Sequence, residues 1–279
     1  MAAKEYGIFL PIGSGGWMLS TTAPHPEATY AYNKRAAMHA EAIGLDFIMS
    51  MAKWRGFGGT TDHWGESLES MTMMAALAEA TENVKIWATV HANVHNPGIA
   101  AKMFTTLQQI SGGRAGMNIV NGAYAAEFAQ YGLWSDLSKE DRYRMTAEWT
   151  DAVLRLWSED SVTLDGEFYQ LREAESRPHP AVRPTIISAG QSPAGRAFQA
   201  AYADGAFLSA RAWAEGATGS AVFQTPYVSG STDTVVEHIR TIVREAELDG
   251  LMLIFPEYDE DMLRFGETVL PQLRKLDED

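Results

Sequence analysis

The sequence predicts an α/β protein of the TIM-barrel type, in which eight parallel strands alternate with helices. Short apolar stretches that suit buried strands alternate with longer stretches of helical periodicity, at spacings of about 30 to 40 residues. The 279 residues accommodate eight such units. A doubly wound open sheet is the alternative, but the Gly-x-Gly-x-x-Gly turn expected after its first strand is missing.

The first half of the chain contains four predicted strands and the three helices between them. Each strand is a short apolar run, and each helix has apolar residues three and four positions apart. Gly44 ends the first helix, Pro97 lies in the first turn of the third, and Gly112-Gly113 precedes the fourth strand. The strands span residues 6–12, 45–50, 84–91 and 115–120, and the helices span residues 27–44, 67–81 and 97–110.

The second half begins with an excursion over residues 124–183, which contains a strong helix at 140–157. Four more strands are predicted at 184–190, 205–210, 222–228 and 250–256, with helices at 192–203, 231–248 and 260–276. Residues 211–221 are too few for a usual crossover with its helix. Either this unit is reduced or residues of a loop are absent from the sequence, and we favour the second. With no repeat or linker, residues 1–279 are predicted to form one domain.

Composition excludes several classes of function. The hydrophobic content of 46% and charged content of 21% are those of an ordinary globular protein. The net charge of −14 argues against nucleic acid and anionic membranes as partners. The lack of cysteine excludes disulfides, thiolate metal sites and cysteine nucleophiles. The first residues do not resemble a signal peptide and no apolar run approaches 18 residues, so we expect a cytoplasmic protein.

The stretch at residues 111–124 is expected to form the floor of an active site. Asn118 lies inside a predicted buried strand, where an amide without a partner costs roughly 1–3 kcal/mol. Hydrogen bonds to neighbouring backbone would satisfy it without any function. However, the carboxyl ends of strands in α/β barrels carry the chemistry, which favours a functional role.

Three further features suit an anionic ligand. Ser192 follows Ala189-Gly190-Gln191 and can cap the next helix, whose N-terminus would attract a phosphate. Arg142 and Tyr143 lie in the run Asp141–Arg144 and offer a guanidinium and a hydroxyl. Lys53 follows the second strand and could meet an anionic ring or phosphate. An ordinary helix cap, a solvated charge run and a surface lysine are the corresponding alternatives.

Aromatic side chains and two histidines complete the candidate site. Trp17, Trp54, Phe57 and Trp64 lie on the loops after the first two strands, and a large planar ligand or core packing would explain them. His91 and His95 follow the third strand and could line the site. A strand ends between these histidines and no His-Glu-x-x-His motif occurs, so no metal site is predicted. Motifs of P-loop proteins and of serine hydrolases with a Gly-x-Ser-x-Gly elbow are also missing.

Several short motifs in one order resemble the bacterial luciferase-like flavin monooxygenases, and among these the pyrimidine (uracil) monooxygenases of the Rut pathway. The similarity covers residues 7–210 and resumes over 220–274. Its motifs are Phe-Leu-Pro-Ile-Gly with Gly-Trp at 9–17, Ser-Met-Ala-Lys-Trp-Arg-Gly-Phe-Gly-Gly at 50–59, Leu-Glu-Ser at 68–70, Ile-Ser-Gly-Gly-Arg at 110–114, Asn-Ile-Val at 118–120, Gly-Glu-Phe-Tyr at 166–169, Ala-Gly-Gln-Ser at 189–192 and Tyr-Ala-Asp at 202–204.

This resemblance implies a TIM barrel that binds reduced FMN at the carboxyl end of its strands. Thr89 and Asn118 match the family positions that hold dioxygen against the flavin. Relatives of this kind use a flavin peroxide to oxygenate and cleave carbon–heteroatom bonds. Carried over by position, the residues expected to contact FMN are Ala52, Lys53, Asn118, Glu127, Arg142, Tyr143 and Ser192, of which the last three would hold the phosphate.

Three departures from the family pattern affect the substrate side. Family members often have tryptophan where this chain has Ala123, which reshapes the site and argues against uracil itself as the substrate. His91 and His95 replace mostly apolar or hydroxyl residues. A helical segment that follows the sixth strand in family members, and often covers the substrate, is short here. With Trp17, Trp54 and Phe57, Ala123 is therefore expected to contact the substrate.

The function predicted by resemblance is a two-component, FMN-dependent monooxygenase. A separate NAD(P)H:flavin reductase would supply reduced FMN, and the enzyme would use O2 to oxygenate or cleave a small heterocycle, amide or sulfur compound. His91 or His95 could transfer a proton, because an unperturbed imidazole titrates near neutral pH. We expect a dimer or tetramer. The alternatives are a deazaflavin- or flavin-dependent reductase and a flavin-binding barrel without oxygenase activity; a metal-dependent hydrolase lacks the required ligand cluster.

Overall fold

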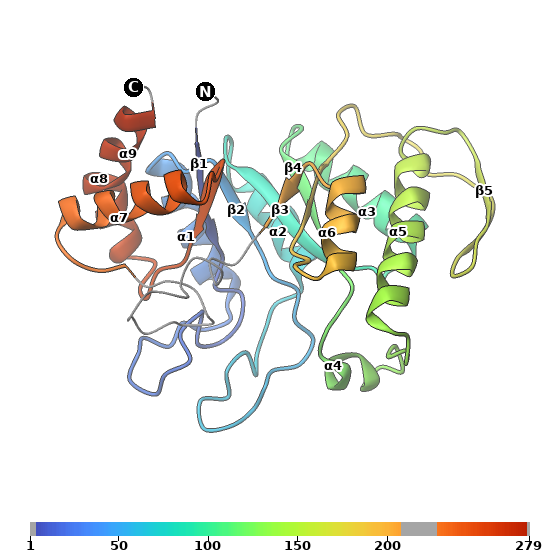
Figure 1. Cartoon of the computed structure of the whole chain (residues 1–279), viewed down its shortest axis with the longest axis horizontal. Helices are drawn as coiled ribbons and strands as arrows, with labels where there is room; N and C mark the ends of the chain where they lie inside the picture. The colour runs from blue at the N-terminus through green and yellow to red at the C-terminus, as the bar shows by residue number, and fades with distance from the viewer. Residues whose placement is uncertain (1–3, 208–227, 278–279) are drawn as a thin grey trace.

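A single parallel sheet forms the centre of the computed structural model, which describes residues 4–207 and 228–277 (Figure 1). Its strands are β1 (Glu5–Phe9), β2 (Phe47–Met49), β3 (Lys85–His91), β4 (Ala115–Val120), β7 (Thr185–Ser188), β8 (Gly205–Ala206) and β9 (Gly250–Leu253). They pair in the order β8-β7-β4-β3-β2-β1-β9, with every described neighbour parallel. This curled sheet confirms the predicted α/β class. Nearly all of the strand predicted at 222–228 lies outside the described residues.

Helices connect the strands and begin where polar side chains cap them. The helices that follow strands of this sheet are α1 (Tyr30–Ala42), α2 (Ser70–Glu79), α3 (Pro97–Ile110), α5 (Lys139–Leu156), α6 (Pro193–Tyr202), α7 (Thr232–Glu245), α8 (Asp261–Thr268) and α9 (Leu270–Asp277). Ser138, Ser192 and Ser231 each accept a hydrogen bond from a first-turn N–H of the following helix. Such caps satisfy backbone donors that the helix itself leaves unpaired.

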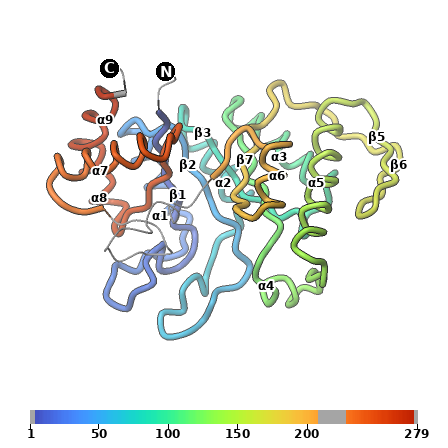
Figure 2. Tube along the Cα trace, viewed as in Figure 1, coloured from blue at the N-terminus to red at the C-terminus, as the bar shows by residue number. Residues whose placement is uncertain are grey.

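Two parts of the chain differ from the sequence prediction. The excursion contains a short helix, α4 (Ala125–Ala129), and an antiparallel hairpin of β5 (Val162–Asp165) and β6 (Gln170–Ala174), which were not predicted. The hairpin stands beside α5, apart from the main sheet (Figure 2). The predicted closing helix is divided into α8 and α9, because Pro271 has no N–H to continue the hydrogen-bond ladder.

The core lies on both faces of the sheet, as expected for parallel strands covered by helices. Ile8, Ile48, Ile86 and Met117 come from four neighbouring strands, and each side chain is fully buried. No helix within residues 4–207 and 228–277 combines the length and apolar character needed to cross a bilayer.

Candidate active site

The floor of the candidate site is a buried polar network at β3 and β4. Thr89 and Asn118 are register partners, and Asn118 Nδ2 donates to Thr89 Oγ1 at 2.9 Å. The Thr89 hydroxyl donates to the carbonyl of Ser50, and its backbone N–H donates to Ser70 Oγ at 3.0 Å. All four residues are buried. Asn118 Oδ1 has no hydrogen-bond partner among the described residues, so the floor presents one unused acceptor.

Beside this floor, a buried ion pair joins the loop after β2 to α4. Lys53 Nζ lies 3.0 Å from Glu127 Oε2, and both side chains are less than a tenth exposed. The ammonium group also lies over the rings of Phe57 and Tyr124, at 4.3 and 4.9 Å from their centroids. Carboxylate and ring faces together stabilise the buried cation. Lys53 is therefore not the surface lysine considered above.

His91 occupies the end of β3 and is enclosed. Its side chain packs against the edge of Phe128, and His91 Nδ1 accepts a hydrogen bond from Trp54 Nε1 at 3.2 Å. Burial, with smaller effects from His95 and Lys53, lowers the pKa of His91 to about 3. The expectation of a near-neutral pKa was wrong for this residue, because it took no account of burial. His91 is uncharged at neutral pH and cannot titrate there.

The turn from His91 to His95 is held in place from outside the barrel. Tyr169 donates its hydroxyl to the carbonyl of Ala92 at 2.9 Å, and Trp149 Nε1 donates to the carbonyl of His95 at 2.7 Å. Both donors come from the excursion, which therefore fixes the backbone of the site. Burial and the nearby Glu148 raise the pKa of Tyr169 to about 12, so its hydroxyl keeps the proton that it donates.

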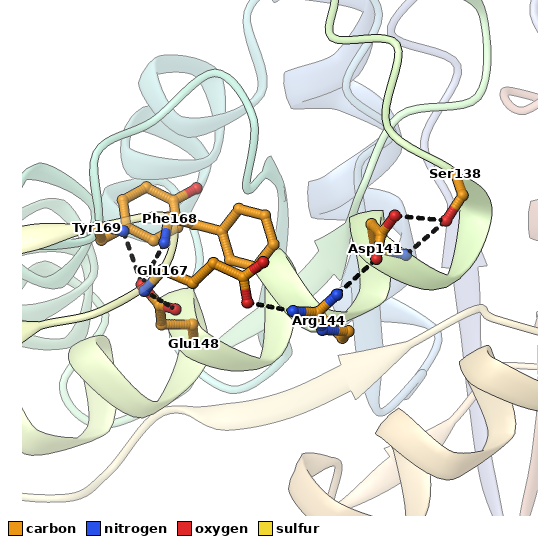
Figure 3. A network of polar contacts seen from close by, with 7 residues as sticks. All are labelled: Ser138, Asp141, Arg144, Glu148, Glu167, Phe168 and Tyr169. Carbon is orange, nitrogen blue, oxygen red and sulfur yellow. Dashed lines mark hydrogen bonds and ion pairs between the residues drawn. The ribbon is translucent and has the colours of Figure 1, made fainter.

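The hairpin that carries Tyr169 is anchored on α5 by Glu148 (Figure 3). The Glu148 carboxylate accepts hydrogen bonds from the backbone N–H groups of Glu167, Phe168 and Tyr169, at 2.9, 2.9 and 2.6 Å. Arg144 bridges Asp141 and Glu167 on the exposed side of the same helix. The Gly-Glu-Phe-Tyr motif thus forms a structural turn, and Arg144 belongs to a surface network.

Tyr143 and Ser192 lie together at the N-terminus of α6, whereas Arg142 lies in the first turn of α5. The Tyr143 hydroxyl packs so closely on the α6 N-terminus that a Cβ on Gly190 would clash with it, and one on Gly195 would lie 2.7 Å from it. Ser192 Oγ accepts the Gly195 N–H at 3.1 Å. Arg142 donates to the carbonyl of Leu137, while its buried Nε has no hydrogen-bond partner in the described parts of the chain. The phosphate role of Arg142, Tyr143 and Ser192 stays a prediction.

The four aromatic residues divide into two pairs. Trp17 and Trp64 are buried, and their ring centroids lie 5.2 Å apart. Each indole N–H donates to a backbone carbonyl. They pack in the core, which was the alternative interpretation, and substrate contact by Trp17 stays a prediction. Trp54 is half-buried and Phe57 is exposed, beside Tyr124.

Ala52 and Ala123 lie on the loops after β2 and β4, half-buried and exposed respectively. His95 is half-buried, with its ring centroid 6.3 Å from that of Trp54. Within the described ranges, no cluster of three or more potential metal-binding side chains occurs.

Comparison of the sequence with known proteins identifies its family. Residues 4–222 match the family model described as luciferase-like monooxygenase. The pyrimidine monooxygenase RutA of Methylorubrum extorquens is 43% identical over 203 residues, covering 72% of this chain and 54% of that protein. The chain therefore spans about half the length of the curated relatives it matches.

Two solved structures share the fold at low sequence identity. EDTA monooxygenase from Chelativorans sp. BNC1 has a TM-score of 0.81 at 13% identity, over 98% of this chain and 94% of that one. The oxygenating constituent of 3,6-diketocamphane monooxygenase from Pseudomonas putida, solved with FMN, has a TM-score of 0.67 at 16% identity, over 99% and 97%. Since the family model covers most of the sequence, the chain belongs to the luciferase-like monooxygenase family.

Proposed function

We propose that this chain is a flavin-dependent monooxygenase that takes reduced FMN from a separate NAD(P)H:flavin reductase and uses O2 to oxygenate a small organic substrate. The observation that carries the proposal is that one fold holds both the buried Asn118–Thr89 floor and the α6 N-terminus with Tyr143 and Ser192 beside it. The name of the relative supports the same chemistry.

The donors at the α6 N-terminus fit the phosphate of FMN. The N-terminus of α6 offers backbone N–H groups and the positive end of the helix dipole. Arg142 has a buried N–H with no partner in the described chain, and the Tyr143 hydroxyl lies against the glycine turn. A dianion at this helix N-terminus would accept from the backbone N–H groups and from Tyr143, and the unpartnered Nε of Arg142 supports the assignment of Arg142 to the same phosphate.

The residues beside the floor fit the ring system of FMN. Lys53 would offer a positive charge to an anionic reduced ring, Ala52 would contact it, and Glu127 would hold Lys53 in place. Asn118 Oδ1 would accept a hydrogen bond that no described residue supplies. The bound reduced flavin supplies the electrons that activate O2.

The floor acts by orientation. Because the Thr89 hydroxyl donates to Ser50, it can only accept from Asn118 Nδ2, and this fixes which end of the amide is left over. The network therefore leaves Asn118 Oδ1 as an acceptor for the flavin, beside the position where Thr89 and Asn118 would hold dioxygen. Among the two histidines, proton transfer remains a proposal for His95 alone.

A heterocycle or cyclic amide is the proposed class of substrate. The relative's name indicates a pyrimidine, and the half-buried indole of Trp54 offers a face for a flat ring. Ala123 leaves space where relatives often carry tryptophan, so we propose a substrate other than uracil. The reaction would take place in the cytoplasm, where reductases supply reduced flavin.

The proposal is tested by anaerobic titration with reduced FMN, followed by rapid mixing with oxygenated buffer. Saturable binding and an absorbance transient absent from free reduced flavin would support an oxygenase. Binding without such a transient would favour the reductase or the flavin-binding alternative. A preference for reduced deazaflavin over reduced FMN would identify the reductase. No binding of either cofactor would overturn the assignment.

A further inference from the structure

The imidazole of His91 is hydrogen-bonded to the indole of Trp54, so it can position this indole without transferring a proton. Its side chain is 5% exposed, and Trp54 Nε1 donates to His91 Nδ1 at 3.2 Å. Since Nδ1 accepts this bond, the proton of the neutral ring belongs on Nε2. The Phe128 ring packs edge-on at 5.0 Å and restricts rotation of the imidazole.

Trp54 is held at two separate points. Its backbone N–H donates to Glu127 Oε1 at 2.6 Å, and its indole N–H donates to His91. The first bond fixes the main chain of the loop after β2, whereas the second fixes the direction of the ring. Only the direction of the ring therefore depends on His91.

The indole forms part of an aromatic surface. Its ring centroid lies 6.3 Å from that of His95 and 6.4 Å from that of Tyr131, the latter ring being nearly perpendicular. Such a surface suits a flat ring, and its shape depends on the angle of the indole. The acceptor behind it is rigid, because Tyr169 and Trp149 fix the main chain of the 91–95 turn.

We propose that His91 is a positioning residue, which as an uncharged acceptor fixes the indole of Trp54 and thereby sets the shape of the substrate side. The substrate part of this inference rests on the proposed function. The hydrogen-bond part does not, since it concerns the protein alone.

The test uses NMR of the full chain with 15N-labelled indole nitrogens, of which there are eight. Trp54→Phe identifies the Trp54 signal. In His91→Leu, this signal should move upfield and its N–H should exchange with water at least tenfold faster. In His91→Asn it should stay near its wild-type position, because an amide oxygen can replace Nδ1. His179→Leu, which removes a half-buried histidine bonded to Glu159, should leave the signal unchanged.

An unchanged Trp54 signal in His91→Leu, or equal displacement in both His91 variants, would overturn the proposal. If His91→Leu does not fold, the tautomer of His91 in the wild-type protein still tests the proposal. With 15N-labelled histidine, the ring signals that are absent from His91→Asn belong to His91. At pH 7 these signals must show the neutral Nε2–H form. The Nδ1–H form or a charged ring would overturn the proposal.

Steady-state kinetics provide a further test once a substrate has been found. His91→Leu should raise KM about fivefold with kcat changed less than about twofold, and His91→Asn should restore KM. An unchanged KM would overturn the substrate part alone. Failure of every substrate would count against the proposed function, while the NMR result would still decide the hydrogen bond.

Discussion

At the scale of single residues, the contacts that define the site join positions far apart in the chain. Lys53 and Glu127 could each be assigned to the flavin by resemblance, but their ion pair depends on the order of β2, β3 and β4 in the sheet. The same holds for Ser50 and Ser70, which complete the floor and were not predicted. Sequence motifs located several of these residues, whereas their contacts with one another follow from the fold.

The buried ion pair predicts an asymmetric response to mutation. Glu127→Gln leaves the ammonium group of Lys53 buried without its counter-charge, and should lower the free energy of unfolding by about 3 kcal/mol. Adding Lys53→Met should restore most of that loss. Urea denaturation of the single and double variants measures both effects. Glu159→Gln, in an exposed ion pair, is the control and should change the free energy of unfolding very little. Equal losses in the single and double variants would contradict this account.

The lowered pKa of His91 predicts that acid decreases the free energy of unfolding. Its folded pKa of about 3 lies below the ordinary value near 6.5, so protons bind preferentially to the unfolded chain. The stabilisation is complete above pH 6.5 and is lost as the pH falls toward 3. Between pH 7.5 and 5.0, the wild type should therefore lose about 2 kcal/mol more than His91→Asn.

Urea denaturation at pH 7.5 and 5.0 measures this difference. His91→Leu should match His91→Asn in pH dependence, whatever its absolute stability, because neither side chain titrates. A wild-type protein with the same pH dependence as both variants would show that His91 is not buried in the neutral form.

At the scale of elements, the alternation of strands and helices was sufficient to predict the parallel sheet and most helix boundaries. The β5–β6 hairpin was missed because only Val162 and Leu164 show the alternation of a strand, within a charged segment. The Gly166 turn inside a family motif was the available signal. Pro271 could have located the division between α8 and α9.

The excursion predicts a link between its hairpin and the site. Glu148→Ala removes the acceptor for three backbone N–H groups and should lower the free energy of unfolding by about 2 kcal/mol. Hydrogen exchange should rise at residues 166–169 and also at 91–95, because Tyr169 would no longer be held against Ala92.

Arg144→Ala provides the control on the same helix, since it removes exposed ion pairs and a cation–π contact with Phe168 but leaves the Glu148 hydrogen bonds in place (Figure 3). Its stability and exchange should stay close to wild type. Faster exchange confined to the hairpin in Glu148→Ala would show that the excursion does not support the site.

At the scale of the whole molecule, an apolar groove formed by described residues is a candidate contact surface for the expected homo-oligomer. It lies between α2 and α3, has a volume of about 480 Å³, and includes Met71, Met103 and Leu107. Ile99 and Ile110 at its edge are 59% and 40% exposed. Association with a second copy at this face would bury them.

Ile99→Glu with Ile110→Glu should therefore convert the expected dimer or tetramer to smaller species, because charges would be buried in the interface. Light scattering after size exclusion measures the mass. Val182→Glu is the control, since Val182 is 60% exposed and is not part of the groove. A wild-type monomer, or a double variant of unchanged mass, would exclude this face.

The place of β1 between β2 and β9 has a consequence for biosynthesis. β1 pairs with β2 on one side and with β9 on the other, so Glu5 meets Gly250. At about 5–20 residues per second, a ribosome needs roughly ten seconds to a minute to deliver β9 after β1. Throughout that interval one edge of an apolar strand has no partner, which favours association between nascent chains. The yield of folded protein should thus depend on translation speed and on chaperones that cover β1 until β9 arrives.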